Sequence, residues 1–148
     1  MIQYSSEVTI ARPPHVVYEA LLDPERFSQW TEMVDVTSDG GDPARVGARG
    51  SFRLAGGPIK GTLSMEVTEL DPDRRIVIHV THPSIDWTSV STLTPDGTGT
   101  RLVYAGDIRL LGWRRLLEAF AAGEVRAGEA AEVVRLKELL EAEAAEPV

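Results

Sequence analysis

Residues 8–30, VTIARPPHVVYEALLDPERFSQW, contain the signals that decide the fold. The run that leads into them, Tyr4 to Ala11, alternates from side to side, which predicts a β-strand with one moderately apolar face. Pro13 and Pro14 end this strand and favour the first turn of a helix, because amide donors have no partner there anyway. The stretch therefore begins as a strand and turns directly into a helix.

An Asp-Pro step divides the helical part of this stretch in two. The first helix is expected from about Pro14 to Leu22. Pro24 disfavours a helical residue before it, while Asp23 can cap a second short helix that runs to about Trp30. The two short helices should make a compact corner after the first strand.

The remainder of the chain reads as a β-meander followed by one long helix. Extended runs of high β propensity alternate with Gly, Pro and Asp turn signals, and such links favour antiparallel pairing. The strands are expected near 34–38, 48–54, 59–70, 75–81, 85–94 and 99–108. An Ala-, Leu-, Glu- and Arg-rich segment then predicts a helix from about Trp113 to Glu143.

Length and charge narrow the function classes. The chain has 148 residues, with 15 basic and 23 acidic side chains and a net charge of −8, so we expect one domain over 1–148. Without a basic patch, nucleic-acid binding and docking on an anionic membrane are disfavoured. The absence of cysteine excludes disulfides, thiolate zinc sites and a cysteine nucleophile. With no leader pattern and no long apolar run, a cytoplasmic protein is the default expectation.

The long helix has apolar residues at both ends and small residues between them. We expect Trp113, Leu117 and Phe120 to mark one buried end and Val133, Leu136 and Leu140 the other. The small residues expected to face inward between them are Gly123, Ala127, Gly128, Ala130 and Ala131. Two interpretations remain open. In the first, a hollow lies beneath these small residues. In the second, there is no hollow, because the sheet approaches the helix closely there or the glycines bend the helix. The charged residues Glu118, Arg126, Glu129, Glu132 and Arg135 are expected on a solvated face.

Several segments resemble a known superfamily over nearly the whole chain. The matching segments are Val8–Pro14, Val17–Phe27, Trp30, Val67–Arg75, Gly99–Tyr104 and Leu136–Glu141. They resemble the START-related, birch-pollen-allergen-like (SRPBCC) proteins, and more narrowly their bacterial polyketide cyclase/dehydrase branch. The resemblance implies an α+β helix-grip fold, in which a curved antiparallel sheet of about seven strands wraps a long C-terminal helix. It also implies a cavity between sheet and helix for a small apolar or aromatic molecule.

The candidate ligand-binding residues follow from the strand faces chosen by side-chain bulk, together with the corner and the long helix. They are Trp30, Met33, Phe52, Leu63, Met65, Ile78, Trp87, Ser89, Tyr104, Trp113, Leu116 and Phe120. Tyr104 and Trp87 are favoured because a buried hydroxyl or indole N–H needs a partner, which a ligand could supply. A shift of one residue would reverse every strand assignment.

Few polar residues are candidates for catalysis or metal binding. His79 and His82 lie three apart in or near a strand and cannot converge on a metal, so no metal site is expected. Glu66 and Arg53 are expected to face outward. No nucleophile elbow, phosphate-binding loop or dinucleotide fingerprint is present, and no cofactor is expected.

Three functions stay open on the sequence. The first is binding of a small apolar or aromatic ligand. The second is a cyclase or aromatase, in which Tyr104, Ser89, Arg53 or His79 would move protons during aldol closure and dehydration. The third is an interaction module that resembles chaperone activators, and the segment around Trp113 could serve a pocket mouth or a homodimer contact.

Overall fold

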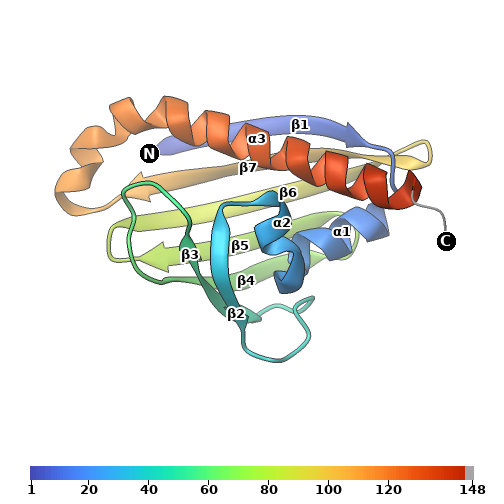
Figure 1. The fold of residues 1–148 in the computed structure, drawn as a ribbon, viewed down its shortest axis with the longest axis horizontal. Helices are drawn as coiled ribbons and strands as arrows, with labels where there is room; N and C mark the ends of the chain where they lie inside the picture. The colour runs from blue at the N-terminus through green and yellow to red at the C-terminus, as the bar shows by residue number, and fades with distance from the viewer. Residues whose placement is uncertain (146–148) are drawn as a thin grey trace.

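The computed structural model of the chain describes residues 1–145, in which one antiparallel sheet is crossed by a long C-terminal helix (Figure 1). The sheet holds seven strands in the order β1-β7-β6-β5-β4-β3-β2. They are β1 (Ile2–Ile10), β2 (Met33–Ser38), β3 (Arg49–Leu54), β4 (Leu63–Asp71), β5 (Arg75–His82), β6 (Ile85–Asp96) and β7 (Gly99–Leu110). This is the helix-grip arrangement expected from the sequence, with the predicted strand near 59–70 beginning only at Leu63.

The N-terminal corner forms as the proline signals indicate. Helix α1 spans Pro14–Leu22, the 3-10 turn η1 spans Pro24–Arg26, and α2 spans Phe27–Trp30. The carboxylate of Asp23 accepts a hydrogen bond from the amide of Glu25 at 3.0 Å, which caps the second helical segment. The apolar side of this corner is buried against the sheet.

Strand pairing confirms the choice of the inner sheet face. The long β6–β7 pairing places Trp87 opposite Ile108 and Ser91 opposite Tyr104. Phe52, Leu63, Trp87 and Tyr104, which are predicted to face inward, are buried, and so are further side chains on the same face, namely Val67, Ile76, Val80, Ile85 and Leu102. The period-2 pattern therefore located the core correctly.

The beginning of the long helix differs from the prediction. A 3-10 segment, η2 (Gly112–Leu117), begins at Gly112, whose φ is positive, and the helix α3 runs from Glu118 to Ala145. Trp113 is 66% exposed and Phe120 84% exposed, so the expected buried end at Trp113, Leu117 and Phe120 is wrong. The tighter turn of η2 changes the direction in which its side chains point, so the apolar residues here do not share the inner face of α3.

In the middle of α3, the residues that face the core are also different from those predicted. Its inner face continues backward from Leu140, Leu136 and Val133 to Glu132 and Glu129, all of which are buried. The small residues Gly123, Ala127, Gly128 and Ala131 are exposed instead. The expected solvated position of Glu129 and Glu132 is therefore wrong, and these exposed small residues cover no hollow.

Polar contacts fix α3 along the N-terminal elements. The backbone amide of Ala11 donates to Glu141 at 2.8 Å, and the guanidinium of Arg12 donates to the carbonyl oxygen of Leu140 at 2.7 Å. The ammonium of Lys137 donates to the carbonyl oxygen of Thr9 at 2.6 Å. These contacts set how the helix is turned about its axis, and so hold Glu129 and Glu132 inward.

Candidate functional site

An apolar cleft lies between the sheet and the short-helix corner. It is lined by Leu21, Phe27, Trp30, Met33, Met65, Ile76, Ile78, Val80, Trp87, Ser89, Ser91 and Tyr104, and is called here the inner cleft. Its empty space is about 460 Å³ with its opening to solvent included, of which about 30 Å³ is wide enough for the centre of a water molecule. That room suffices for about two waters. The cleft is thus narrow in this conformation.

Most of the predicted ligand-binding residues meet in this cleft. Those that line it are Trp30, Met33, Met65, Ile78, Trp87, Ser89 and Tyr104. Phe52 and Leu63 are fully buried core residues that do not line it. The predicted positions of Trp113, Leu116 and Phe120 in a cavity wall are wrong, because these side chains lie on the surface. The lining comes from the sheet and the corner, and none of the described side chains of α3 is part of it.

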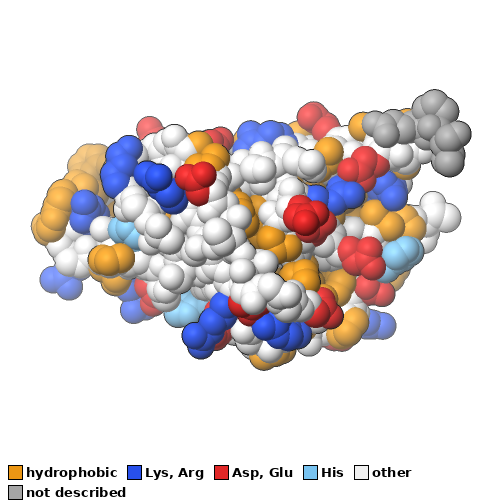
Figure 2. Space-filling view, turned by 60° about the horizontal axis from the view of Figure 1, so that its bottom comes forward, with side chains coloured by type: hydrophobic (Ala, Val, Ile, Leu, Met, Phe, Trp, Pro, Cys, Tyr) orange, Lys and Arg blue, Asp and Glu red, His pale blue; other side chains and the backbone are white. Residues whose placement is uncertain are grey.

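A second cleft adjoins the first and shares Phe27, Met65 and Ile78 with it. Its further lining is Leu22, Pro24, Ser38, Pro43, Ala48, Arg49, Gly50 and Val67, and it is called here the loop cleft. Figure 2 shows hydrophobic side chains at the centre of one face, with acidic and basic groups around them. Because Met65 lies between the two clefts and is a flexible side chain, its movement would join them.

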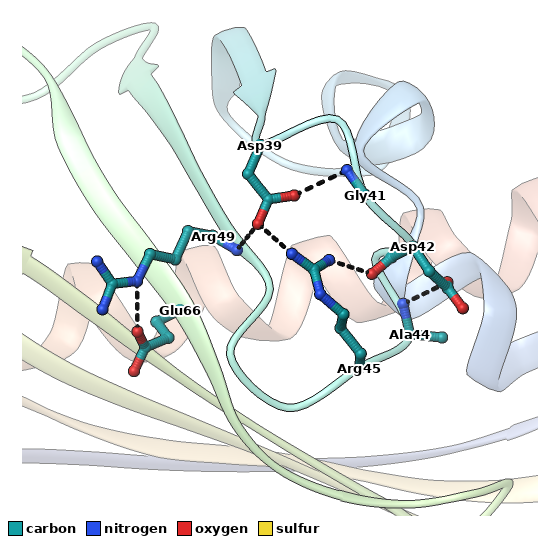
Figure 3. A network of polar contacts seen from close by, with 7 residues as sticks. All are labelled: Asp39, Gly41, Asp42, Ala44, Arg45, Arg49 and Glu66. Atoms are coloured by element: carbon teal, nitrogen blue, oxygen red, sulfur yellow. Dashed lines mark hydrogen bonds and ion pairs between the residues drawn. The ribbon is translucent and has the colours of Figure 1, made fainter.

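Residues of the loop between β2 and β3 help to line the loop cleft, and polar contacts hold this loop together (Figure 3). The carboxylate of Asp39 accepts hydrogen bonds from the guanidinium of Arg45 at 2.6 Å and from the amides of Arg49 and Gly41 at 3.0 Å each. These donors, the guanidinium first, lower the pKa of Asp39 to about 2. The loop between β2 and β3 is therefore tied to the start of β3.

Aromatic side chains surround the inner end of the cleft. The indole N–H of Trp87 donates to the hydroxyl of Tyr4 at 2.9 Å. The ring of Tyr104 lies 6.0 Å, centroid to centroid, from both Tyr4 and Trp30, and it meets Trp30 edge-on. Gly106 makes room for this arrangement, because a Cβ there would come within 2.5 Å of the Tyr4 hydroxyl oxygen.

Two buried carboxyl groups lie beside these rings. Glu129 and Glu132 are each 8% exposed. Burial, followed by the charge of Glu132, raises the pKa of Glu129 to about 9, so this carboxyl is protonated at neutral pH. Burial also raises the pKa of Glu132 and, together with the charge of Glu129, raises the pKa of Tyr104 well above its ordinary value.

The carboxyl pair is not part of the lining of the inner cleft, but it lies next to residues that are. Glu129 influences the titration of Tyr104, while an oxygen of Glu132 lies 3.5 Å from the backbone nitrogen of Glu32, between the cleft residues Trp30 and Met33. Two buried polar atoms here have no hydrogen-bond partner in the described residues: Nε1 of Trp30 and Oε2 of Glu129. An unpaired buried polar atom is costly and unusual.

Sequence reasoning missed this carboxyl pair, although a signal for it existed. Counting back by three or four residues from Leu140 and Leu136 leads to Val133, Glu132 and then Glu129. The prediction instead placed small residues between Val133 and an expected buried end at Trp113, Leu117 and Phe120. Those last three residues belong to η2 or lie at the exposed start of the helix, so they report nothing about the inner face.

The polar candidates on the sheet lie on its outer side. His79 pairs with Asp86, and Arg49 pairs with Glu66, at an open surface groove with about 510 Å³ of empty space, its opening to solvent included. Arg53 is exposed and lies 3.7 Å from Asp35. The suggestion that Arg53 or His79 moves protons inside a cavity is therefore wrong, because alternation along the strands directs both side chains outward.

The described residues hold no group of three His, Asp or Glu side chains arranged to bind a metal ion. In residues 1–145, each helix is too short or too polar to cross a lipid bilayer.

Comparison with known proteins agrees with this architecture. Residues 1–141 match the family described as "Polyketide cyclase / dehydrase and lipid transport". No curated protein matches the sequence. TTHA0849 from Thermus thermophilus has a TM-score of 0.78 at 19% identity, with 98% of this chain and 99% of that chain covered.

Two further solved structures share the fold. DynU16, a protein in the dynemicin biosynthetic locus, gives a TM-score of 0.70 at 22% identity over 95% of this chain and 48% of that one. The Aha1 dimer from Colwellia psychrerythraea gives 0.68 at 18% identity over 95% and 97%. At these identities the structures show the fold alone, whereas the family match covers nearly the whole sequence. The chain therefore belongs to the polyketide cyclase/dehydrase and lipid transport family.

Proposed function

We propose that this protein binds a small, mainly apolar molecule in the inner cleft, with a polar group of that molecule at the end near Glu129 and Trp30. The family description, which joins cyclase and lipid-transport proteins, supports a ligand of this kind. The lining supports it as well, because apolar and aromatic side chains surround a few polar groups, as in most small-molecule sites.

The observation that carries the proposal is the pair of unpartnered buried atoms beside the cleft. Nε1 of Trp30 is a hydrogen-bond donor on a side chain only 3% exposed, and Oε2 of Glu129 belongs to a side chain 8% exposed. Each such atom costs about 1–3 kcal/mol when it is buried without a partner. A ligand with donor and acceptor groups would remove that cost.

Binding requires the cleft to widen, since its present room is that of about two waters. Met33 and Met65 are the side chains best suited to move, because both are only partly buried and methionine has three rotatable bonds. A shift of Met65 would add the loop cleft, with about 330 Å³ of empty space including its opening, to the volume open to a ligand.

A second candidate function is a cyclase or dehydratase, and the buried carboxyl pair favours it. Such an enzyme needs an internal acid or base within reach of the substrate. Glu129, held protonated beside Glu132, could donate a proton to a carbonyl or a leaving hydroxyl group, and the raised pKa of the pair suits an acid working near neutral pH. Loss of turnover in Glu129→Gln with binding retained would favour the enzyme over a carrier.

Native mass spectrometry of freshly purified protein tests the binding proposal. A retained small molecule is expected on the wild-type chain, together with loss of that molecule in Met65→Trp, where a bulkier ring fills the junction of the two clefts. Val46→Trp, at a side chain that is 61% exposed, is the matched control and should retain the molecule.

A second variant that fills the cleft keeps the test valid if Met65→Trp does not fold. Met33→Trp fills the cleft from β2, and circular dichroism checks that both variants keep their secondary structure. If folded Met65→Trp and Met33→Trp carry the same molecule at the same occupancy as Val46→Trp, the inner cleft is not the binding site.

A further inference from the structure

We propose that the ligand of the inner cleft carries a protonated amine, which lies between the carboxyl groups of Glu129 and Glu132 and the rings of Trp30 and Tyr104. This inference rests on the proposed function, and it adds the charge of the ligand. Two buried carboxyl groups beside the cleft would by themselves fit several ligands. The unpartnered Oε2 of Glu129 is the second observation, because it is an acceptor that the described protein groups leave free.

The charges around the cleft favour a cation over an anion. The groups that act on the carboxyl pair are each other, Glu32, the hydroxyls of Tyr4 and Tyr104, and the guanidinium of Arg135. Arg135 is the one cation among them, and it donates to the backbone oxygen of Trp30 at 3.1 Å and lies 3.7 Å from Glu32. Its charge is thus engaged at the surface, and the interior side of the pair has no positive neighbour among the described residues.

The aromatic side chains fit the same ligand. The faces of Trp and Tyr rings attract cations, most strongly when the cation is removed from water. Trp30 and Tyr104 both line the cleft, and their rings lie 6.0 Å apart, centroid to centroid, with an angle of 72° between their planes. Carboxylate and ring faces together bind an ammonium group better than either does alone, while an incoming carboxylate would be repelled.

The number of protons released on binding distinguishes an amine ligand from a neutral one. At neutral pH the free protein keeps a proton on Glu129. When an ammonium ion binds, the carboxyl ionises to form the ion pair, and its proton passes to the buffer. A neutral ligand of the same shape would accept or donate a hydrogen bond without releasing that proton.

The test uses benzylamine, benzyl alcohol and benzoate, which share a ring and differ in charge. Binding at pH 7 is followed by NMR titration of the amides around the inner cleft. Benzylamine is expected to bind about tenfold more tightly than benzyl alcohol, a net preference of about 1.4 kcal/mol that remains after the cost of ionising Glu129 at pH 7, and benzoate is expected not to bind. Calorimetry in phosphate and in Tris buffer should show about one proton released with benzylamine and none with the alcohol.

Glu129→Gln supplies the residue-level test. Benzylamine should then bind about tenfold more weakly, at the level of the alcohol on the wild-type chain, and release no proton. Glu138→Gln removes a carboxylate from the exposed side of α3 and should leave the preference for the amine unchanged.

The outcomes separate the two proposals. If benzyl alcohol binds at the cleft as tightly as benzylamine, or if Glu129→Gln keeps the amine preference, the amine inference is wrong while the binding function stands. If none of the three probes shifts the cleft amides and the purified chain carries no molecule, the binding function is wrong as well.

Discussion

In two parts of the C-terminal segment, the side chains lie in the opposite environment from the one that their polarity would suggest. In η2 and the first turn of α3, the aromatic and aliphatic residues Trp113, Leu116 and Phe120 are exposed, while in the middle of α3 the acidic residues Glu129 and Glu132 are buried. Figure 2 shows hydrophobic side chains at the left end of the molecule, where Figure 1 places the segment before α3.

The comparison shows that the packing of the far end of a helix sets which residues face inward along its length. Val133, Leu136 and Leu140 are almost fully buried, and the polar ties to β1 hold that end in place. A rigid α-helix transmits this orientation backward by about 100° per residue, so Glu129 must face the core whatever its polarity. Groups buried in spite of their chemistry are candidates for function.

The largest effect should come from the apolar end of α3. Leu136→Ala removes a fully buried side chain and should lower the free energy of unfolding by about 2–5 kcal/mol. Val134→Ala, at a neighbouring position that is 44% exposed, should change it by less than about 0.5 kcal/mol. Urea unfolding of both variants gives the comparison, and equal losses would mean that α3 is turned differently.

The next effect is the change of folding stability with pH that the Glu129 carboxyl causes. Because the folded protein holds the Glu129 proton more tightly than the unfolded chain does, the wild type loses stability as pH rises from about 4.5 toward about 9. Glu129→Gln cannot ionise, so its stability relative to the wild type should increase with pH, by on the order of 4 kcal/mol between pH 5 and pH 8, since nearly three pH units at about 1.4 kcal/mol each separate the two. Thermal unfolding at both pH values measures this.

The matched control for that experiment is Glu138→Gln, because Glu138 is exposed on the same helix. Its stability relative to the wild type should change little between pH 5 and pH 8. A Glu129→Gln protein that behaves like this control would show that Glu129 titrates as a surface carboxyl does.

A smaller effect is expected at the glycines that the sequence placed above a possible hollow. A Cβ at Gly128 would meet no atom within 4 Å, and the residue lies on the exposed side of α3. Gly128→Ala should therefore stabilise the protein by about 0.5–1 kcal/mol through helix propensity. A loss of stability in chemical unfolding would place Gly128 against the sheet instead.

The smallest effect is expected at the exposed aromatic end. Phe120→Ala should change the free energy of unfolding by less than about 0.5 kcal/mol, since the ring is 84% exposed. The homodimer stays a prediction, and sedimentation velocity of the wild type and of Phe120→Ala tests it by measuring the oligomeric state of both. A loss of several kcal/mol would show that this ring is buried in solution.

The parts of the fold that were predictable are those in which local signals act alone. Pro13, Pro14 and the Asp23-Pro24 step defined both short helices, and the alternation in β4 to β7 identified the buried face. Those signals work because proline geometry and strand alternation do not depend on distant contacts. Trp30, Met65 and Tyr104 were accordingly placed in the cleft from the sequence.

The carboxyl pair was not predictable by the same means. Residue type argued for a solvated Glu129, and only the packing of α3 against β1 and the corner overrides that preference. Which elements form the cleft walls was equally unpredictable, because only the tertiary structure shows that the short helices, and none of the described side chains of α3, line the cleft opposite the sheet.

The most direct test of this account is a carbon-13 NMR titration of the side-chain carboxyl of Glu129, assigned by comparison with Glu129→Gln. We expect a midpoint near pH 9 that falls when benzylamine occupies the cleft. A midpoint near 4.5 that benzylamine leaves unmoved would contradict it.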